Sequence, residues 1–133
     1  MILMLRLLII VIVSLLYACA AKASHDESTK QLTEADTGRS IELHIGDELE
    51  VTLPANPTTG FQWEVSAVDT SILRSIGKPK FEPSNDAVGS GGQVTFRFKA
   101  VEIGQTGLKL IYHRSFEKNV LPAQTFEVTV TVR

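Results

Sequence analysis

Apolar and polar residues alternate along most of the chain from residue 40 onwards. The apolar members are Ile41, Leu43 and Ile45; Leu49, Val51 and Leu53; Phe61, Trp63 and Val65; Val94, Phe96, Phe98 and Ala100; Leu108, Leu110 and Tyr112; and Phe126, Val128, Val130 and Val132. A period of two residues is typical of strands that bury one face. Turn signals such as Gly46-Asp47 separate these runs, so the pattern predicts short strands joined by tight connections.

The remaining stretches fit the same architecture. Residues 71–81 are less regular, and Lys78-Pro79-Lys80 indicates an edge strand or a bend, because proline donates no ladder hydrogen bond. No helical period follows the N-terminal segment. We therefore predict an all-β fold over residues 39–133, an antiparallel immunoglobulin-like β-sandwich of about seven to eight strands. Trp63 is a candidate core residue whose N–H needs a partner if it is buried.

The first 19 residues read as a signal peptide. Leu7 to Leu16 is apolar except for Ser14, and small residues follow it. This run is shorter than the roughly 20 apolar residues that span a bilayer, which favours a cleaved segment over the alternative of an uncleaved anchor. Residues 20–38 are polar, and we expect them to form a tether that leads into the domain.

Cys19 is the single cysteine, so the exported domain has no internal disulfide. Leu16-Tyr17-Ala18-Cys19 resembles a bacterial lipobox, which makes Cys19 a lipidation candidate, although Tyr17 is unusual at its position. The alternative is ordinary cleavage after Ala20 or Ala23. We expect an exported protein: a periplasmic or outer-membrane-anchored lipoprotein if bacterial, otherwise a secreted one. Contact with a membrane is expected only through this lipid anchor.

Charge and composition exclude several classes of function. The formal net charge is −2, and no basic cluster interleaved with aromatic residues is present, so we expect no nucleic-acid partner. His44 and His113 have no spacing that ties them to a catalytic partner, and no ligand cluster indicates a metal. We therefore expect no enzyme activity, no catalytic residues, no metal and no cofactor. We also expect a monomer.

The stretch Asn56-Pro57-Thr58-Thr59-Gly60-Phe61 interrupts the strand pattern with turn chemistry. Pro57 fixes its own φ and keeps Asn56 extended, and Gly60 can adopt a positive φ. The stretch predicts a short, rigid loop that presents two hydroxyls and free backbone amides. An ordinary hairpin turn is the alternative.

Two further loops stand out, at residues 89–92 and 113–116. If the three are the second, fourth and sixth connections, they share one end of the sandwich. Glycines at positions 89, 91 and 92 remove side chains where two backbones must approach closely. Arginine and aromatic residues, here Arg114 and Phe116, are frequent hot spots of interfaces. Taken singly, either loop is also explained as a flexible or solvated turn.

The three loops together resemble the chagasin family of cysteine protease inhibitors. Residues 56–61 match its NPTTG(F/Y) motif, and Gly89-Ser90-Gly91-Gly92 matches its GxGG motif. Arg114-Ser115-Phe116 resembles its third motif, RPW, with serine in place of proline and phenylalanine in place of tryptophan. The resemblance covers roughly residues 39–133, with the motifs in order.

The resemblance implies a reversible inhibitor of papain-like cysteine proteases. Thr58 and Thr59 would lie beside the catalytic cysteine and histidine of the target. The glycine loop would lie along the substrate channel, and Arg114 and Phe116 would contact the opposite side. The predicted protease-binding residues are Asn56, Pro57, Thr58, Thr59, Gly60, Phe61, Gly89, Ser90, Gly91, Gly92, Arg114 and Phe116. The alternative function is an exported adhesion or envelope-assembly module with no protease target.

Overall fold

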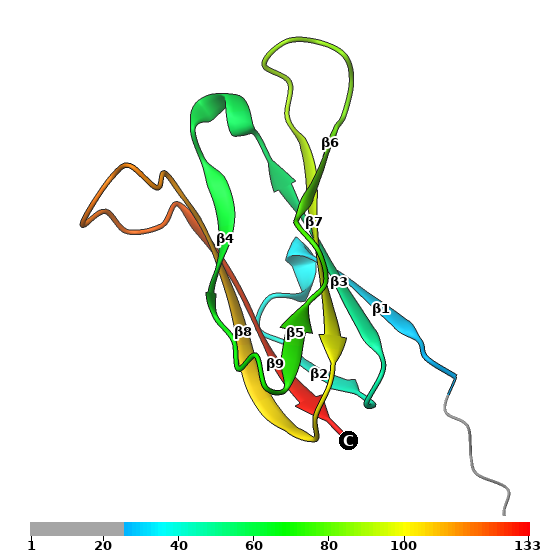
Figure 1. Ribbon diagram of the computed structural model, residues 1–133. Helices are drawn as coiled ribbons and strands as arrows, with labels where there is room; N and C mark the ends of the chain where they lie inside the picture. Colours follow the sequence, from blue (N-terminus) through cyan, green and yellow to red (C-terminus); the bar gives the residue numbers. More distant parts are fainter. Residues whose placement is uncertain (1–25) are drawn as a thin grey trace, which may run out of the picture.

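Within residues 26–133, which the computed structural model describes, nine strands form two sheets packed face to face (Figure 1). The strands are β1 (Thr29–Thr33), β2 (Ser40–Leu43), β3 (Glu48–Ala55), β4 (Gln62–Ala67), β5 (Leu73–Ser75), β6 (Lys80–Pro83), β7 (Gly92–Ala100), β8 (Gly104–His113) and β9 (Gln124–Val132). Two short 3-10 turns, η1 (Glu34–Asp36) and η2 (Pro57–Thr59), complete the fold. This part of the chain contains no helix long and apolar enough to cross a membrane.

One sheet has the order β1-β3-β7-β5, with β6 also paired to β7, and the other has the order β2-β9-β8-β4. Strands β5 and β6 pair with successive parts of β7, so they act as one interrupted strand, with Lys78 and Pro79 in the break. The predicted sandwich is confirmed, with eight strand positions counted in this way. Five of the seven strand pairs are antiparallel, as predicted, and two pairs at the sheet edges differ, since β1 is parallel to β3 and β2 is parallel to β9.

Strand β1 corrects the predicted tether over residues 20–38. It pairs with β3 from Thr29 opposite Glu48 to Thr33 opposite Thr52, and the Leu32 side chain is buried in the core. Residues 29–38 are therefore part of the sandwich, not a linker. An edge strand that contributes one apolar side chain leaves no alternating pattern in the sequence. The predicted signal peptide, Cys19 and the rest of residues 1–25 lie outside the described residues.

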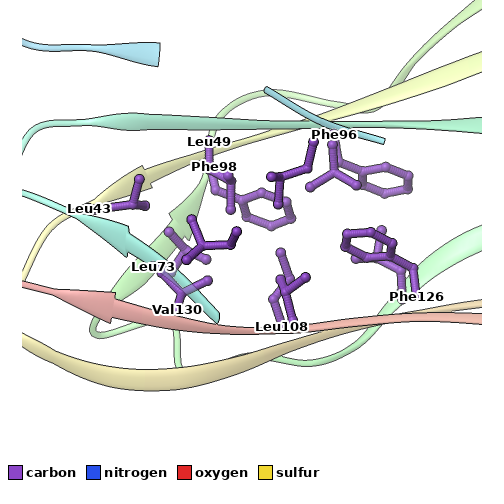
Figure 2. Packing of buried hydrophobic residues seen from close by; sticks show 14 of the residues in the cluster. Leu43, Leu49, Leu73, Phe96, Phe98, Leu108, Phe126 and Val130 are labelled. Carbon is purple, nitrogen blue, oxygen red and sulfur yellow. The ribbon is translucent and has the colours of Figure 1, made fainter. Parts of the chain in front are cut away.

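The core lies between the two sheets and is built from the alternating apolar positions of both. Figure 2 shows side chains such as Leu49, Phe98, Leu108 and Phe126 converging from opposite sheets, and all four are fully buried. Trp63 is also buried, and its Nε1–H donates to the Pro54 carbonyl at 2.8 Å, the kind of partner that the sequence required.

Ile45 departs from the predicted alternation. Strand β2 ends at Leu43, so Ile45 lies in the following turn, where it is exposed. The same turn holds Asp47, a buried carboxylate that accepts hydrogen bonds from the backbone amides of Ser28 and His44 at 3.1 and 2.8 Å. A buried carboxylate is tolerated only when it is hydrogen-bonded in this way. Asp47 thereby joins the start of β1 to the β2–β3 turn.

Both termini of the sandwich lie at the same end. Thr29 begins β1 beside Glu48, the first residue of β3, and Val132 ends β9 beside Gly104, the first residue of β8. The far ends of β3 and β8 carry the predicted functional loops (Figure 1). Residue 29, where β1 begins, therefore lies at the end opposite those loops.

The position of Leu32 gives a direct test of the corrected domain boundary. We expect Leu32→Ala to lower the free energy of unfolding by roughly 2–5 kcal/mol, because it leaves a cavity under β1. Urea denaturation of the protein from residue 20 onwards measures the change. The neighbouring exposed variant Gln31→Ala is the control, with an expected effect within about 0.5 kcal/mol. If Leu32→Ala and the parent protein had equal free energies of unfolding, residues 29–33 would be a tether and not part of the folded domain.

Candidate functional site

The three loops singled out in the sequence meet at one end of the sandwich (Figure 1). They connect β3 to β4, β6 to β7, and β8 to β9. With β5 and β6 counted as one strand, and counting from β2, these are the second, fourth and sixth connections. The predicted arrangement is therefore confirmed, and hydrogen bonds described below join the central β3–β4 loop to both neighbours.

The central loop is held in a single turn of 3-10 helix by its own side chains. Asn56 is extended, with φ of −136°, and its side-chain oxygen accepts from both the backbone amide and the hydroxyl of Thr58. The Thr59 hydroxyl donates to the Asn56 carbonyl at 2.7 Å. Gly60 ends the turn in the left-handed region, with φ of +82°, which glycine adopts without strain. The sequence-based prediction of a rigid loop fits this geometry.

The amides of this loop are not free, contrary to the sequence-based expectation. The amide of Thr58 donates to the Asn56 side chain, and that of Thr59 donates to the Asn56 carbonyl. The Gly60 amide donates to the Pro57 carbonyl, and the Phe61 amide to the Thr59 hydroxyl. An isolated six-residue loop must satisfy its own donors, so the same bonds that stiffen it consume them. Thr58 and Thr59 are exposed, but their hydroxyls are likewise bonded within the loop, to the side chain and the carbonyl of Asn56.

Asn56 also joins the central loop to the glycine loop. Its side-chain amide donates to the Gly89 carbonyl at 3.1 Å, and its backbone amide donates to the Tyr112 hydroxyl at 3.0 Å. A side chain added at Gly91 would lie 3.2 Å from the Ala55 carbonyl, so the two loops pack backbone against backbone. One residue thus sets the spacing between two of the three loops.

Gly92 has a structural role that the motif alone does not reveal. It begins β7, is buried, and a Cβ placed there would come within 2.1 Å of the Glu82 carbonyl on β6. The close backbone approach predicted for this glycine therefore occurs inside the protein, between β7 and β6. Gly89 differs, since it is exposed and has φ of +80° at the tip of the loop.

Arg114 fastens the third loop to the central one. Its Nε donates to the Thr59 carbonyl at 3.1 Å, and its guanidinium carbon lies 4.4 Å from the centroid of the Phe61 ring. Its Nη1 pairs with a carboxylate oxygen of Glu117 at 3.0 Å within the same loop. The sequence assigned Arg114 only to contact with a partner. In the free protein it positions the central loop, through a hydrogen bond and a cation–π contact.

An aromatic stack connects these loops to the core, and sequence reasoning missed its central member. The Tyr112 ring lies 5.3 Å from that of Phe61 and 5.1 Å from that of Trp63, so buried and loop-side rings form one column. Tyr112 had been assigned only as an inward strand residue. A tyrosine near the end of a strand carries a polar tip that usually finds a partner, and here that partner is Asn56.

His113 forms a contact that the sequence did not indicate. Its Nε2 lies 2.7 Å from a carboxylate oxygen of Glu64, across the pairing of β4 with β8. Cross-strand register decides which residues meet, and it cannot be read from spacing along the chain. Among residues 26–133, no group of three or more histidine, cysteine or acidic side chains is placed to hold a metal ion.

The contacts of Arg114 predict its contribution to loop order. Its hydrogen bond and its cation–π contact are each worth roughly 0.5–1.5 kcal/mol, so Arg114→Ala should speed amide hydrogen exchange at residues 59–61 about tenfold. Lys118→Ala, which removes an exposed cation of the same loop, should leave exchange unchanged. Exchange followed by NMR gives the comparison. Unaltered exchange in Arg114→Ala would show that the central loop is ordered without this residue.

Comparison with known proteins places these loops in a family. The model of the chagasin family of peptidase inhibitors matches residues 42–130. Amoebiasin-2 of Entamoeba histolytica is 27% identical over 103 residues, which cover 77% of this chain and 84% of that protein. Chagasin of Trypanosoma cruzi is 27% identical over 88 residues, covering 63% of this chain and 80% of that protein.

A solved structure supports the fold independently. The crystal structure of a cysteine protease inhibitor from Entamoeba histolytica superimposes with a TM-score of 0.74 at 23% identity, and the match covers 83% of this chain and all of that one. The predicted fold and the resemblance drawn from the three motifs are thus confirmed, as is the prediction that the protein is not an enzyme. The chain belongs to the chagasin family of peptidase inhibitors.

Proposed function

We propose that this protein, acting as a monomer, reversibly inhibits papain-like cysteine proteases by closing their active-site cleft with three loops. The observation that carries the proposal is the direct bonding of the central loop to both flanking loops, through Asn56 on one side and Arg114 on the other. The family supplies the inhibitory class, and the Entamoeba histolytica neighbour is itself a cysteine protease inhibitor.

The loop conformation supports inhibition without cleavage. A papain-like cleft binds an extended substrate backbone, whereas residues 57–59 form a 3-10 turn that begins with a proline. A carbonyl held in such a turn is badly placed for nucleophilic attack, because attack requires the reacting atoms to be aligned. Since the turn is already bonded within itself, little conformational entropy is lost when it enters the cleft.

The roles of the loops follow their positions in the fold. Thr58 and Thr59, both exposed at the tip of the central loop, lie beside the catalytic cysteine and histidine of the target. The loop at residues 89–92 follows the substrate channel on one side. Phe116, a residue that is 71% exposed, contacts the wall on the other side, while Arg114 bonds this loop to the Thr59 carbonyl of the central one.

The third loop is constrained although serine occupies position 115, where the family motif has proline. The Glu117 amide donates to the Arg114 carbonyl at 3.1 Å, which closes a turn around Ser115 and Phe116, and the side chains of Arg114 and Glu117 pair at 3.0 Å. These two contacts supply the rigidity that proline would otherwise give. Phenylalanine offers less contact area than tryptophan, so this loop contributes a smaller share of the binding energy.

We propose further that the protein is exported and that Cys19 carries a lipid anchor. The support is the sequence alone: an apolar run of signal-peptide length followed by Leu16-Tyr17-Ala18-Cys19. Expressed as the full chain in a bacterial host, the protein should partition with membranes and label with radioactive palmitate, and Cys19→Ser should abolish both. A soluble, unlabelled product starting after Ala20 or Ala23 would instead establish secretion by ordinary cleavage.

Titration of papain with the protein from residue 20 onwards tests the inhibitory function. We expect reversible inhibition, with an inhibition constant raised at least about tenfold in the double variant Thr58→Ala, Thr59→Ala. The reason is that the variant loses contact area and the hydroxyl bonds that shape the loop. Initial rates at several substrate concentrations separate binding from slow turnover of the inhibitor.

The matched control is Thr29→Ala, Thr70→Ala, which removes two exposed threonines away from the three loops. Its inhibition constant should equal that of the parent protein. If the parent protein fails to inhibit papain at micromolar concentration, and fails on a panel of related proteases, the inhibitory function is rejected. The alternative of an adhesion or envelope-assembly module would then be tested.

A further inference from the structure

Exposed apolar side chains gather at the loop end of the molecule. Among residues 26–133 seven large apolar side chains are exposed, and four of these lie on the loops at this end: Val88, Phe116, Val120 and Leu121. Clustered exposed apolar residues mark interaction surfaces more often than scattered ones do. Val120 and Leu121 follow the third motif in sequence but are not part of it, so neither the motif nor the family resemblance accounts for them.

Val120 and Leu121 are held in a defined place. Leu121 precedes Pro122, which restricts it to extended conformations, and Asn119 turns the chain with φ of +59°. The Ala123 amide then donates to the Tyr112 carbonyl at 2.8 Å, which returns the loop to the sheet. Leu121 remains 89% exposed in this arrangement. Because the backbone that carries Leu121 is already restrained in this way, little further backbone ordering is needed when its side chain is covered.

The two residues line a pocket that continues from the proposed inhibitory surface. The pocket has a volume of about 200 Å³, and its lining includes Phe61 and Arg114 as well as Val120 and Leu121. Phe61 and Arg114 are the residues that fasten the third loop to the central one. A protease seated on the central loop therefore has this pocket directly beside its cleft.

The two charged side chains that line the pocket, Arg114 and Glu117, pair with each other at 3.0 Å. His113, which also lines it, lies 2.7 Å from a carboxylate oxygen of Glu64. A pocket whose lining charges are paired and whose rim is apolar favours an apolar partner, because a charged partner would lose its hydration without gaining a new ion pair inside it.

We propose that Val120 and Leu121 form a specificity-determining contact, which receives an apolar patch on the protease wall flanking the cleft. This contact rests on the proposed inhibitory function and extends it. Proteases with an apolar residue at that wall bind tightly, and those with a charged or strongly polar wall bind less well. The contact acts mainly by slowing dissociation, as short-range apolar contacts do.

The test compares inhibition constants of matched double variants against papain and a panel of papain-like proteases. We expect Val120→Ser, Leu121→Ser to raise the inhibition constant about ten- to hundredfold for the proteases that the parent protein binds most tightly, which corresponds to the burial of one to two apolar side chains. The loss should be similar at low and high ionic strength, because apolar contacts are not screened by salt. Leu121→Met should retain the parent affinity.

The control is Ile45→Ser, Ile103→Ser, which removes two exposed apolar residues from the turns at the opposite end. It should inhibit like the parent protein. An equal inhibition constant for the Val120 and Leu121 variant overturns the contact while leaving the inhibitory function in place. Tighter binding by Leu121→Lys would also overturn it, since that result identifies an acidic wall. Absence of inhibition by the parent protein rejects the function itself, and the contact with it.

Discussion

The side chain of Asn56 is the point on which the loop end of this molecule depends. It caps the central turn through its oxygen and reaches the Gly89 carbonyl through its nitrogen, while its backbone amide is bonded to Tyr112. An amide side chain accepts through its oxygen and donates through its nitrogen at once, whereas an ionised carboxylate can only accept. Replacement by aspartate would therefore keep the turn but lose its bond to the neighbouring loop.

Arg114 provides the corresponding connection on the other side of the central turn. Together the two residues join three separate connections, two of them hairpins and one that crosses between the sheets, into one surface. The stacked rings of Phe61, Tyr112 and Trp63 anchor this surface to the core. The sandwich beneath supplies only the spacing of the strand ends. The rigidity of the loop end comes from bonds among loop residues, so a common fold can carry an uncommon binding surface.

Most of the sandwich could be predicted from the sequence, because period-two alternation is a local property of each strand. The features that were missed depend on partners far along the chain. Leu32 is a lone apolar residue in a polar run, and only pairing with β3 makes it part of the core. The contact between His113 and Glu64 requires the register of β4 against β8.

The candidate site shows the same division. The turn residues of the central loop could be identified from their backbone preferences, and the motif order located its neighbours. The sequence could not show that the loop's amides are consumed internally, or that Gly92 is required by packing against Glu82. Both facts depend on the positions of neighbouring backbone segments, and a sequence motif contains no information about those positions. The sequence alone suggested that the loop amides and Gly92 serve contact with a partner. The structure shows that they fix the shape of the loops in the free protein.

The first strand begins and the last strand ends at the end of the sandwich opposite the three loops. Whatever is joined directly before β1 or after β9, whether a lipid bilayer, a second folded unit or a solid support, is attached a full strand length away from the proposed inhibitory surface. Several copies could thus be joined in tandem or spread over a surface with their three loops pointing outward. Such a layer would intercept proteases approaching from the surroundings, and it would be a natural format for an affinity matrix.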